Sequence, residues 1–157
     1  MTPDVESIDP AHPDFRMEEW PLYWVMRVGR QYTMDLDRAL KRIGMDVARW
    51  RVLIILSEHE RASVTTLSDH AIIKLPTMTK TIARMEAQGL VRTFPNPEDR
   101  RVTLVEVTNL GSEKTALVRQ QASRIFQSAF HGISPDETAA LVVTMKKVFA
   151  NLVNLPR

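Results

Sequence analysis

The polar side chains of residues 76–84 are spaced to share one face of a helix. At 100° per residue, Lys80 points directly away from the apolar side of that helix, and hydroxyl and guanidinium groups flank it. Such groups hydrogen-bond to phosphates and to base edges, and a threonine methyl group can contact thymine. We therefore predict a DNA-binding face with Thr79 at its border. The face consists of Pro76, Thr77, Thr79, Lys80 and Arg84.

A second charged group, Asp99, Arg100 and Arg101, lies between two β-rich segments. The segments are LVRTF (90–94) and RVTLVEVT (101–108), and the linking sequence PNPEDR is too long for a two-residue turn. They predict a hairpin with a charged loop. An arginine at its tip can enter the narrow minor groove of DNA, and we expect Asp99 to pair with one arginine and aim it.

Six helices are predicted to position these groups, because apolar residues recur every three or four positions. Ser63 and Thr108 are suited to cap the starts of two helices, and Gly89 is suited to follow the end of the fourth. The sequence SPDE (134–137) is typical of a capping box at the start of the last helix. The helices span about 18–42, 47–58, 64–71, 76–88, 109–131 and 135–152.

The order of these elements predicts a mainly α fold with a small β-hairpin. Helices 64–71 and 76–88 meet across a short turn, which is typical of a helix-turn-helix, and the hairpin that follows is a wing. The fourth helix is expected to bury Leu75, Met78, Ile82 and Met85. A cationic helix face or a charged hairpin tip is, by itself, usually only a solvated surface. The prediction of DNA binding therefore depends on their order along the chain.

The stretch LPTMTKTIARMEAQGLVRTFPNPEDRRVTLVEVTNLG (75–111) resembles the multiple-antibiotic-resistance regulator (MarR) family. The similarity includes the recognition helix, its Leu-Glu-x-x-Gly-Leu-Val-x-Arg exit, the Asp-Arg-Arg wing and the Leu-Thr-x-x-Gly start of the next helix. Met85 stands where the exit motif begins with leucine, and Val107 replaces the leucine of the last motif. The similarity in helix order covers about 20–153, and its specific part is 46–111.

This resemblance implies a homodimeric regulator with a winged helix-turn-helix at 46–108 and a helical dimerisation region at 17–45 and 109–157. An extended N-terminal arm (1–16) precedes it. A two-fold dimer is expected to bind a pseudo-palindrome with half-sites about 34 Å apart. Dimerisation would also explain the length of the first helix. At roughly 36 Å, that helix is longer than the core of a small domain can cover.

Members of the family bind a small molecule, often an aromatic acid, between the dimer helices and the DNA-binding lobe, so we expect release of a repressor by such an effector. Some members instead use a reactive cysteine, which this chain lacks, or zinc. Aromatic walls and a guanidinium group could hold an aromatic carboxylate. Tryptophans on amphipathic helices are more often core residues, and that alternative stays open. The candidate ligand residues are Trp20, Trp24, Arg27, Arg49 and Trp50.

The composition argues against most other classes. The net charge is +2, no apolar run is long enough to span a membrane, and the start lacks the features of a secretory signal, so we expect a cytoplasmic protein. Scattered histidines predict no metal site, and no cofactor is expected. No catalytic motif indicates an enzyme, and five glycines leave little for a phosphate-binding loop. The main alternative is a winged helix that binds protein; activation instead of repression also remains open. The histidines are His12, His59, His70 and His131.

Overall fold

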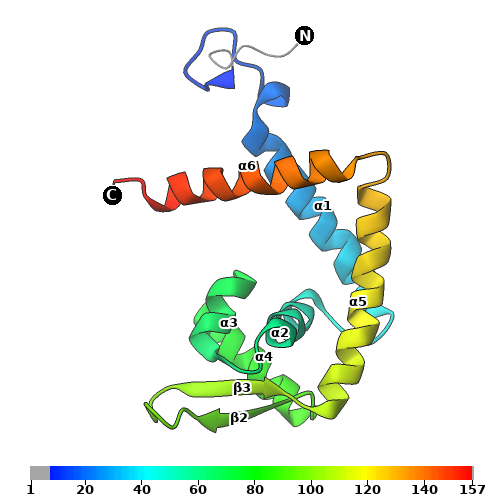
Figure 1. The fold of residues 1–157 in the computed structure, drawn as a ribbon, viewed down its shortest axis with the longest axis vertical. Coiled ribbons are helices and arrows are strands. Elements are labelled where there is room, and N and C mark those ends of the chain that lie inside the picture. The colour runs from blue at the N-terminus through cyan, green and yellow to red at the C-terminus, as the bar shows by residue number, and fades with distance from the viewer. Residues whose placement is uncertain (1–7, 157) are drawn as a thin grey trace. The chain divides into compact units, whose positions relative to one another are not determined.

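The computed structural model describes residues 8–156, which form two compact units divided between Ile125 and Phe126 (Figure 1). The second unit contains the end of α5 and all of α6 (Pro135–Val153). The fold is a mainly helical winged helix-turn-helix with long terminal helices, as predicted. The first unit contains η2 (Met17–Glu19), α1 (Pro21–Lys41), α2 (Val47–Glu58), β1 (Ala62–Ser63), α3 (Val64–Ala71), α4 (Leu75–Ala87), β2 (Val91–Pro95), β3 (Thr103–Val107) and most of α5 (Asn109–Ala129).

The predicted arm, residues 1–16, is not extended where the structure describes it. The amide of His12 donates to the carbonyl of Asp9 at 2.9 Å, and the amide of Phe15 donates to the carbonyl of His12 at 3.0 Å. These bonds make two successive turns, each with a proline at its second position, where the fixed φ of proline fits a turn. The first seven residues of the predicted arm lie outside the described part of the chain.

Helix α1 begins at Pro21, three residues later than the predicted start at Glu18. Proline suits the first helical position because its missing N–H would have no partner there. It also pushes the preceding residue out of the helical region, and Trp20 has an extended backbone (φ −79°, ψ 118°). The helix is 21 residues long, and its C-terminal half carries the buried Leu36 and Leu40.

Helices α2, α3 and α4 occupy the predicted positions to within one residue. Asp46 caps α2 by accepting from the amide of Arg49 at 2.9 Å. Ser63 caps α3 by accepting from the amide of Thr66 at 3.0 Å. The apolar faces of these three helices pack in one core with residues of α1, β2, β3 and α5. This core includes Leu36, Leu40, Val52, Leu53, Leu56, Leu67, Met78, Ile82, Met85, Val91, Val105 and Val118.

The wing is a three-stranded antiparallel sheet in the order β1–β3–β2. The predicted hairpin is present, with Val91 opposite Val107 and Pro95 opposite Thr103. Strand β1 was not predicted, because two residues are too few to show the alternating pattern of a strand. Ala62 pairs with Val105, so β1 attaches the start of α3 to the wing.

The α5 helix starts against the wing through a close contact at Gly111. The hydroxyl oxygen of Thr108 accepts from the amide of Gly111 at 3.1 Å and donates to the carbonyl of Gly89 at 2.6 Å. A Cβ atom at Gly111 would lie only 2.0 Å from the carbonyl oxygen of Leu90. This position therefore requires glycine.

The second unit begins its last helix with the predicted capping box. The hydroxyl oxygen of Ser134 accepts from the amide of Glu137 at 3.2 Å, and the Glu137 carboxylate accepts from the Ser134 amide at 2.8 Å. These bonds from Ser134 lower the pKa of Glu137. The start of α6 is thereby fixed by local sequence alone.

Candidate nucleic-acid interface

The outer face of α4 presents the side chains that the sequence predicted. Thr77, Lys80 and Arg84 are exposed, whereas Met78 and Met85 on the opposite face are buried. The prediction that Leu75 is buried was wrong, since this residue is 45% exposed. Leu75 is the first residue of α4, and its side chain lines an open hollow between α3, α4 and the wing instead of packing in the core.

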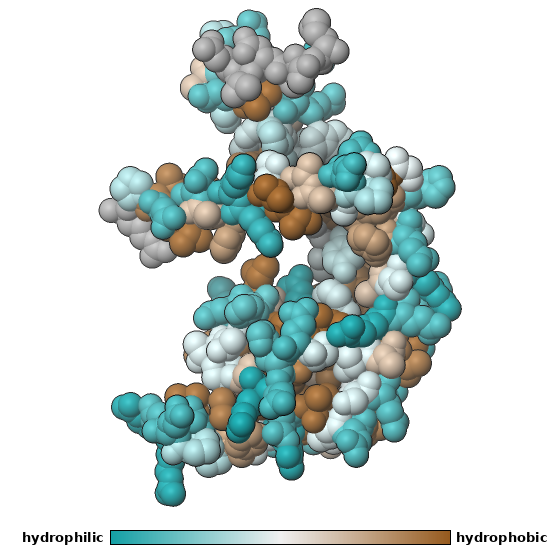
Figure 2. Space-filling view, in the orientation of Figure 1, coloured by the Kyte–Doolittle hydropathy of each residue, from teal (hydrophilic) through white to brown (hydrophobic). Residues whose placement is uncertain are grey.

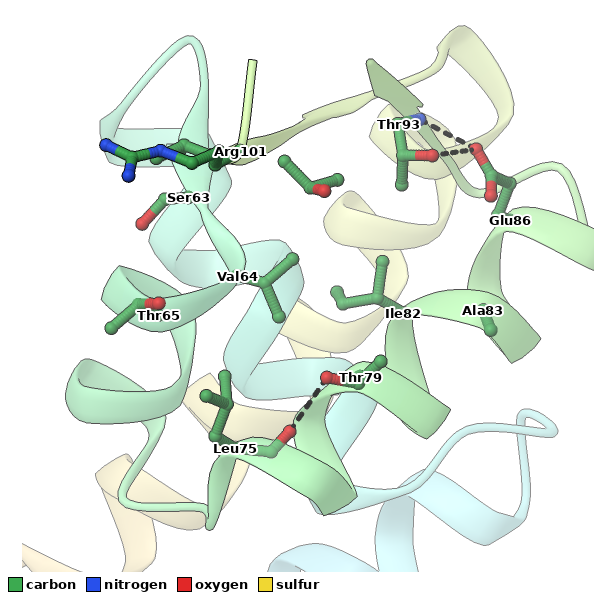
Figure 3. Close-up of a pocket in the computed structure, with 12 residues that line it drawn as sticks. Ser63, Val64, Thr65, Leu75, Thr79, Ile82, Ala83, Glu86, Thr93 and Arg101 are labelled. Atoms are coloured by element: carbon green, nitrogen blue, oxygen red, sulfur yellow. Dashed lines mark hydrogen bonds between the residues drawn. The ribbon is translucent and has the colours of Figure 1, made fainter. Parts of the chain in front are cut away.

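Thr79 faces the wing instead of the outer surface. Its hydroxyl donates to the carbonyl of Leu75 at 3.0 Å, and its side chain lines a hollow of about 380 Å³ between α3, α4 and the wing (Figure 3). Arg101 also lines this hollow. The predicted position of Thr79 at the border of the face agrees with this geometry, and Pro76 is exposed in the first turn of α4.

Arg84 makes a contact that the sequence did not predict. One of its terminal nitrogens lies 3.0 Å from a carboxylate oxygen of Asp46, and its side chain is still 53% exposed. The same carboxylate oxygen accepts from Nε of Arg49 at 3.0 Å. Asp46 therefore holds the guanidinium end of Arg84 toward α2, although about half of the side chain stays exposed. The Asp46–Arg49 spacing is visible in the sequence, but the link to Arg84 spans 38 residues.

Asp99 and Arg101 form a two-point ion pair in the wing loop. Nε and a terminal nitrogen of Arg101 each donate to one Asp99 carboxylate oxygen at 3.0 Å, and the Arg101 amide donates at 3.1 Å. These hydrogen bonds lower the pKa of Asp99 and raise the pKa of Arg101. The two parallel hydrogen bonds favour one orientation of the planar guanidinium group, and the side chain is 90% exposed. Arg100 is exposed beside it.

The wing is fixed to α4 through Glu86. Its carboxylate accepts from the amide and from the hydroxyl of Thr93, both at 2.7 Å (Figure 3). Across the sheet, Arg92 pairs with Glu106. The recognition helix and the wing are therefore joined by buried apolar residues and by a specific polar contact, so their cationic groups keep a defined separation.

The five candidate ligand residues do not form one cluster. Trp20 packs edge-on against Phe15, with ring centres 6.2 Å apart. The indole N–H of Trp24 donates to the carbonyl of Glu18 at 2.7 Å, and the guanidinium carbon of Arg27 lies 5.9 Å from the centre of the Trp24 ring. These contacts are all local to the first turns of α1 and the segment before it.

Trp50 lies on α2 and has a different aromatic neighbour, Tyr32, at 6.4 Å. Its buried indole N–H has no hydrogen-bond partner among the described residues. Burial raises the pKa of the Tyr32 phenol, and the charge of Arg51 opposes that rise. Arg49 instead donates to Asp46 and to the side-chain oxygen of Gln88 at 3.1 Å. The spacing of residues in the sequence could not show that Trp50 and its neighbour Arg49 have different surroundings.

Within residues 8–156, no group of three or more histidine, cysteine or acidic side chains could hold a metal ion. No helix in the same range has the length and hydropathy needed to cross a lipid bilayer. The exposed polar side chains on the outer face of α4 are hydroxyls and cations, which is the chemistry of phosphate and base recognition.

Comparisons with known proteins place these features in context. Residues 46–103 match the sequence profile of the MarR family. The chain is 43% identical over 147 residues to the HTH-type transcriptional repressor IacR of Pseudomonas putida, covering 94% of this chain and 88% of the relative. Because this relative is similar over almost the whole length, the likeness includes the helices outside the lobe.

Solved structures agree with the fold. A MarR-family regulator from Silicibacter pomeroyi superposes with a TM-score of 0.80 at 24% identity, covering 95% of this chain and 96% of that one. BpsR of Bordetella bronchiseptica, whose DNA binding is regulated by 6-hydroxynicotinic acid, superposes with a TM-score of 0.70 at 25% identity. The match covers 80% of this chain and 96% of BpsR.

Proposed function

The chain belongs to the MarR family of transcriptional regulators, and from this premise we propose that it is a homodimeric repressor released from a pseudo-palindromic operator by a small aromatic acid. The observation that carries the DNA-binding part is that an exposed face with Thr77, Lys80 and Arg84 is combined with a wing-tip arginine paired to Asp99. The relative IacR is itself a repressor, which supports repression over activation.

In the proposed complex, α4 enters the major groove and the wing reaches the minor groove. Lys80 and Arg84 contact guanine edges or phosphates, and Thr77 offers a hydroxyl and a methyl group. Arg101, already oriented by Asp99, enters the narrow groove, where the potential is most negative, and Arg100 contacts the adjacent backbone. Pro76 and Thr79 shape the two edges of the face.

Exposed apolar side chains on the long helices support dimerisation. In the first unit, the N-terminal half of α1 exposes Trp24, Met26 and Val28. In the second unit, hydrophobic side chains lie open along α6 (Figure 2). Val142 and Phe149 are among the exposed residues of this helix. Soluble monomers rarely leave this much apolar surface in water, so a second copy is the proposed cover for the regions 17–45 and 109–157.

The proposed effector is an aromatic carboxylate. BpsR responds to 6-hydroxynicotinic acid, which has an aromatic ring and a carboxyl group. In this chain, the buried indole N–H of Trp50 has no acceptor among the residues that the structure describes, and the Tyr32 ring lies beside the indole. Trp20, Trp24, Arg27 and Arg49 remain the other candidate residues. Such an acid releases DNA only if it binds more tightly to a conformation that mismatches the operator.

The test is selection of bound fragments from random DNA, followed by mobility-shift titration with a panel of aromatic acids. We expect an inverted repeat with half-sites about one helical turn apart and weaker binding with at least one acid. Trp50→Phe keeps the aromatic ring, removes the indole N–H, and is expected to weaken the response to the acid without changing affinity for DNA. Absence of any selected sequence at moderate salt would reject the proposal.

A further inference from the structure

Ile72, in the turn between α3 and α4, has an unusual backbone and an unusual exposure. Its φ is +55° and its ψ is +47°, which is the left-handed helical region. Among the described residues, it is the only non-glycine with a positive φ. Its side chain is 85% exposed to solvent. A β-branched residue in this region is a conformational outlier, because its Cβ crowds the backbone.

Within residues 8–156, the same helix ending occurs twice more, each time with glycine. At the end of α1, the amide of Met45 donates to the carbonyl of Leu40 at 3.0 Å, with Gly44 at φ +71°. At the end of α4, the amide of Leu90 donates to the carbonyl of Met85 at 2.9 Å, with Gly89 at φ +71°. This bond pattern is the Schellman motif, which favours glycine at the left-handed residue just before the donating amide. Ile72 occupies that position after α3.

Hydrogen bonds around Ile72 hold the strained turn in place. The amide of Ile73 donates to the carbonyl of Ser68 at 3.0 Å, and the buried Ser68 hydroxyl donates back to the carbonyl of Ile73 at 2.6 Å. A terminal nitrogen of Arg51 donates to the carbonyl of Ala71 at 2.7 Å. Three hydrogen bonds thus constrain the backbone on either side of Ile72. A strained conformation persists only when the surrounding structure holds it in this way. The apolar side chain is held in water by a rigid turn.

The surroundings of this side chain indicate what it contacts. The turn leads directly into α4, where Leu75 and Pro76 are also exposed. Lys74 is exposed at the N-cap of α4, and Lys80 follows on the outer face. An exposed apolar side chain in a segment that also carries cations is complementary to DNA, where the thymine methyl group is the apolar feature of the major groove and the phosphates are negative. A protein partner would find less apolar surface here than on α1 or α6.

We propose that Ile72 is a specificity-determining residue that contacts a thymine methyl group in each half-site, with Leu75 and Pro76 at the edge of the contact. This inference rests on the proposed DNA-binding function. It explains why isoleucine occupies a position where glycine would relieve both the strain and the exposure. The recognition surface then begins in the turn, three residues before the first residue of α4.

The test uses the DNA fragment that the wild-type protein selects from a random pool. Each thymine in turn is replaced by deoxyuridine, which removes only the methyl group. We expect one thymine per half-site at which this replacement weakens wild-type binding about fourfold, the value of one buried methyl-sized group. Ile72→Asn tolerates the left-handed backbone and lacks the apolar contact, so it should bind thymine and deoxyuridine versions equally. Ile72→Val should keep most of the preference.

Protein stability provides the internal control. Ile72→Gly and Ile72→Asn should unfold at the same or a higher urea concentration than the wild type, so weaker DNA binding cannot come from misfolding. The inference is overturned if wild type ignores every methyl deletion or if Ile72→Asn keeps the preference. Loss of oligomer mass in Ile72→Asn, without a change in the thymine preference, would assign the residue to a protein contact instead. Failure of wild type to select any DNA would reject the proposed function itself.

Discussion

The side chain of Arg84 illustrates how one residue can serve the fold and a ligand. Its ion pair with Asp46 at 3.0 Å links α4 to the N-cap of α2. The pair is partly exposed and therefore contributes little to stability in water. Arg84 can exchange this carboxylate for a guanine edge or a phosphate at small cost, and it begins from a restricted orientation.

We predict that Arg84→Ala weakens binding to the selected operator by about 1–3 kcal/mol, because a direct contact with a base or a phosphate is lost. Mobility-shift titration at fixed salt measures the change. Arg124→Ala, which removes an exposed arginine from α5, is the matched control and should bind as the wild type does. If the two variants bind the operator with equal affinity, Arg84 does not contact DNA.

Arg101 is predicted to act mainly through charge. Arg101→Ala should lower the slope of log affinity against log salt by about one for each wing that contacts phosphates. Asp99→Asn keeps that charge and removes its partner, so the slope should not fall while discrimination between sequences decreases. Titrations between 50 and 200 mM salt, roughly the range over which phosphate contacts lose most affinity, measure both effects. An unchanged slope in Arg101→Ala would place the wing away from DNA.

The pH dependence of the wing follows from the same pair. Because Arg101 lowers the pKa of Asp99, the carboxylate stays charged as the pH falls through the ordinary range of aspartate. The orientation of Arg101 is therefore present above that range and is lost only in more acidic solution. The wild-type salt slope should be constant from about pH 8 to pH 5, since the ordinary aspartate pKa is about 3.9.

At the level of the elements, the contact between α5 and the wing depends on one glycine. A Cβ atom on Gly111 would lie 2.0 Å from the carbonyl oxygen of Leu90 and 2.6 Å from a methyl carbon of Val107. The first of these is backbone and cannot rotate away. The start of α5 and strands β2 and β3 would have to separate, which also disturbs the wing.

Gly111→Ala is predicted to lower the free energy of unfolding by about 3 kcal/mol, at the upper end for overpacking. Urea unfolding followed by circular dichroism measures this loss. Gly29→Ala is the matched control, because a Cβ atom there has no neighbour within 4 Å and the residue lies inside α1. It should stabilise the protein by up to about 1 kcal/mol. Equal behaviour of the two variants would contradict the close contact.

Local chemistry explains which elements the sequence predicted. Ser63, Ser134 and Gly89 mark helix boundaries through bonds to residues at most five positions away, so their motifs were readable. The outer face of α4 followed from periodicity alone. By contrast, the Asp46–Arg84 pair and strand β1 depend on contacts between distant parts of the chain. The left-handed Ile72 was missed because no residue preference predicts it.

At the level of the whole molecule, we propose that the exposed apolar side chains of the long helices affect DNA binding by joining two copies of the chain. Phe149 on α6 is 69% exposed, which is a large apolar area to leave in water. If a second copy covers it, two recognition helices are joined, and the second half-site binds at a high effective concentration. Affinity for an inverted repeat then depends on dimerisation as much as on the side chains of α4.

We predict that Phe149→Asp shifts the protein from dimer to monomer in sedimentation velocity and weakens binding to a two-half-site operator about 100-fold, the lower end expected for lost bivalency. Binding to a single half-site should change little, because the DNA-binding lobe is intact. Thr144→Asp introduces the same charge at an exposed polar position of α6 and should remain dimeric. A monomeric wild type, or a dimeric Phe149→Asp with unchanged affinity, would show that the apolar face of α6 does not join the two recognition helices.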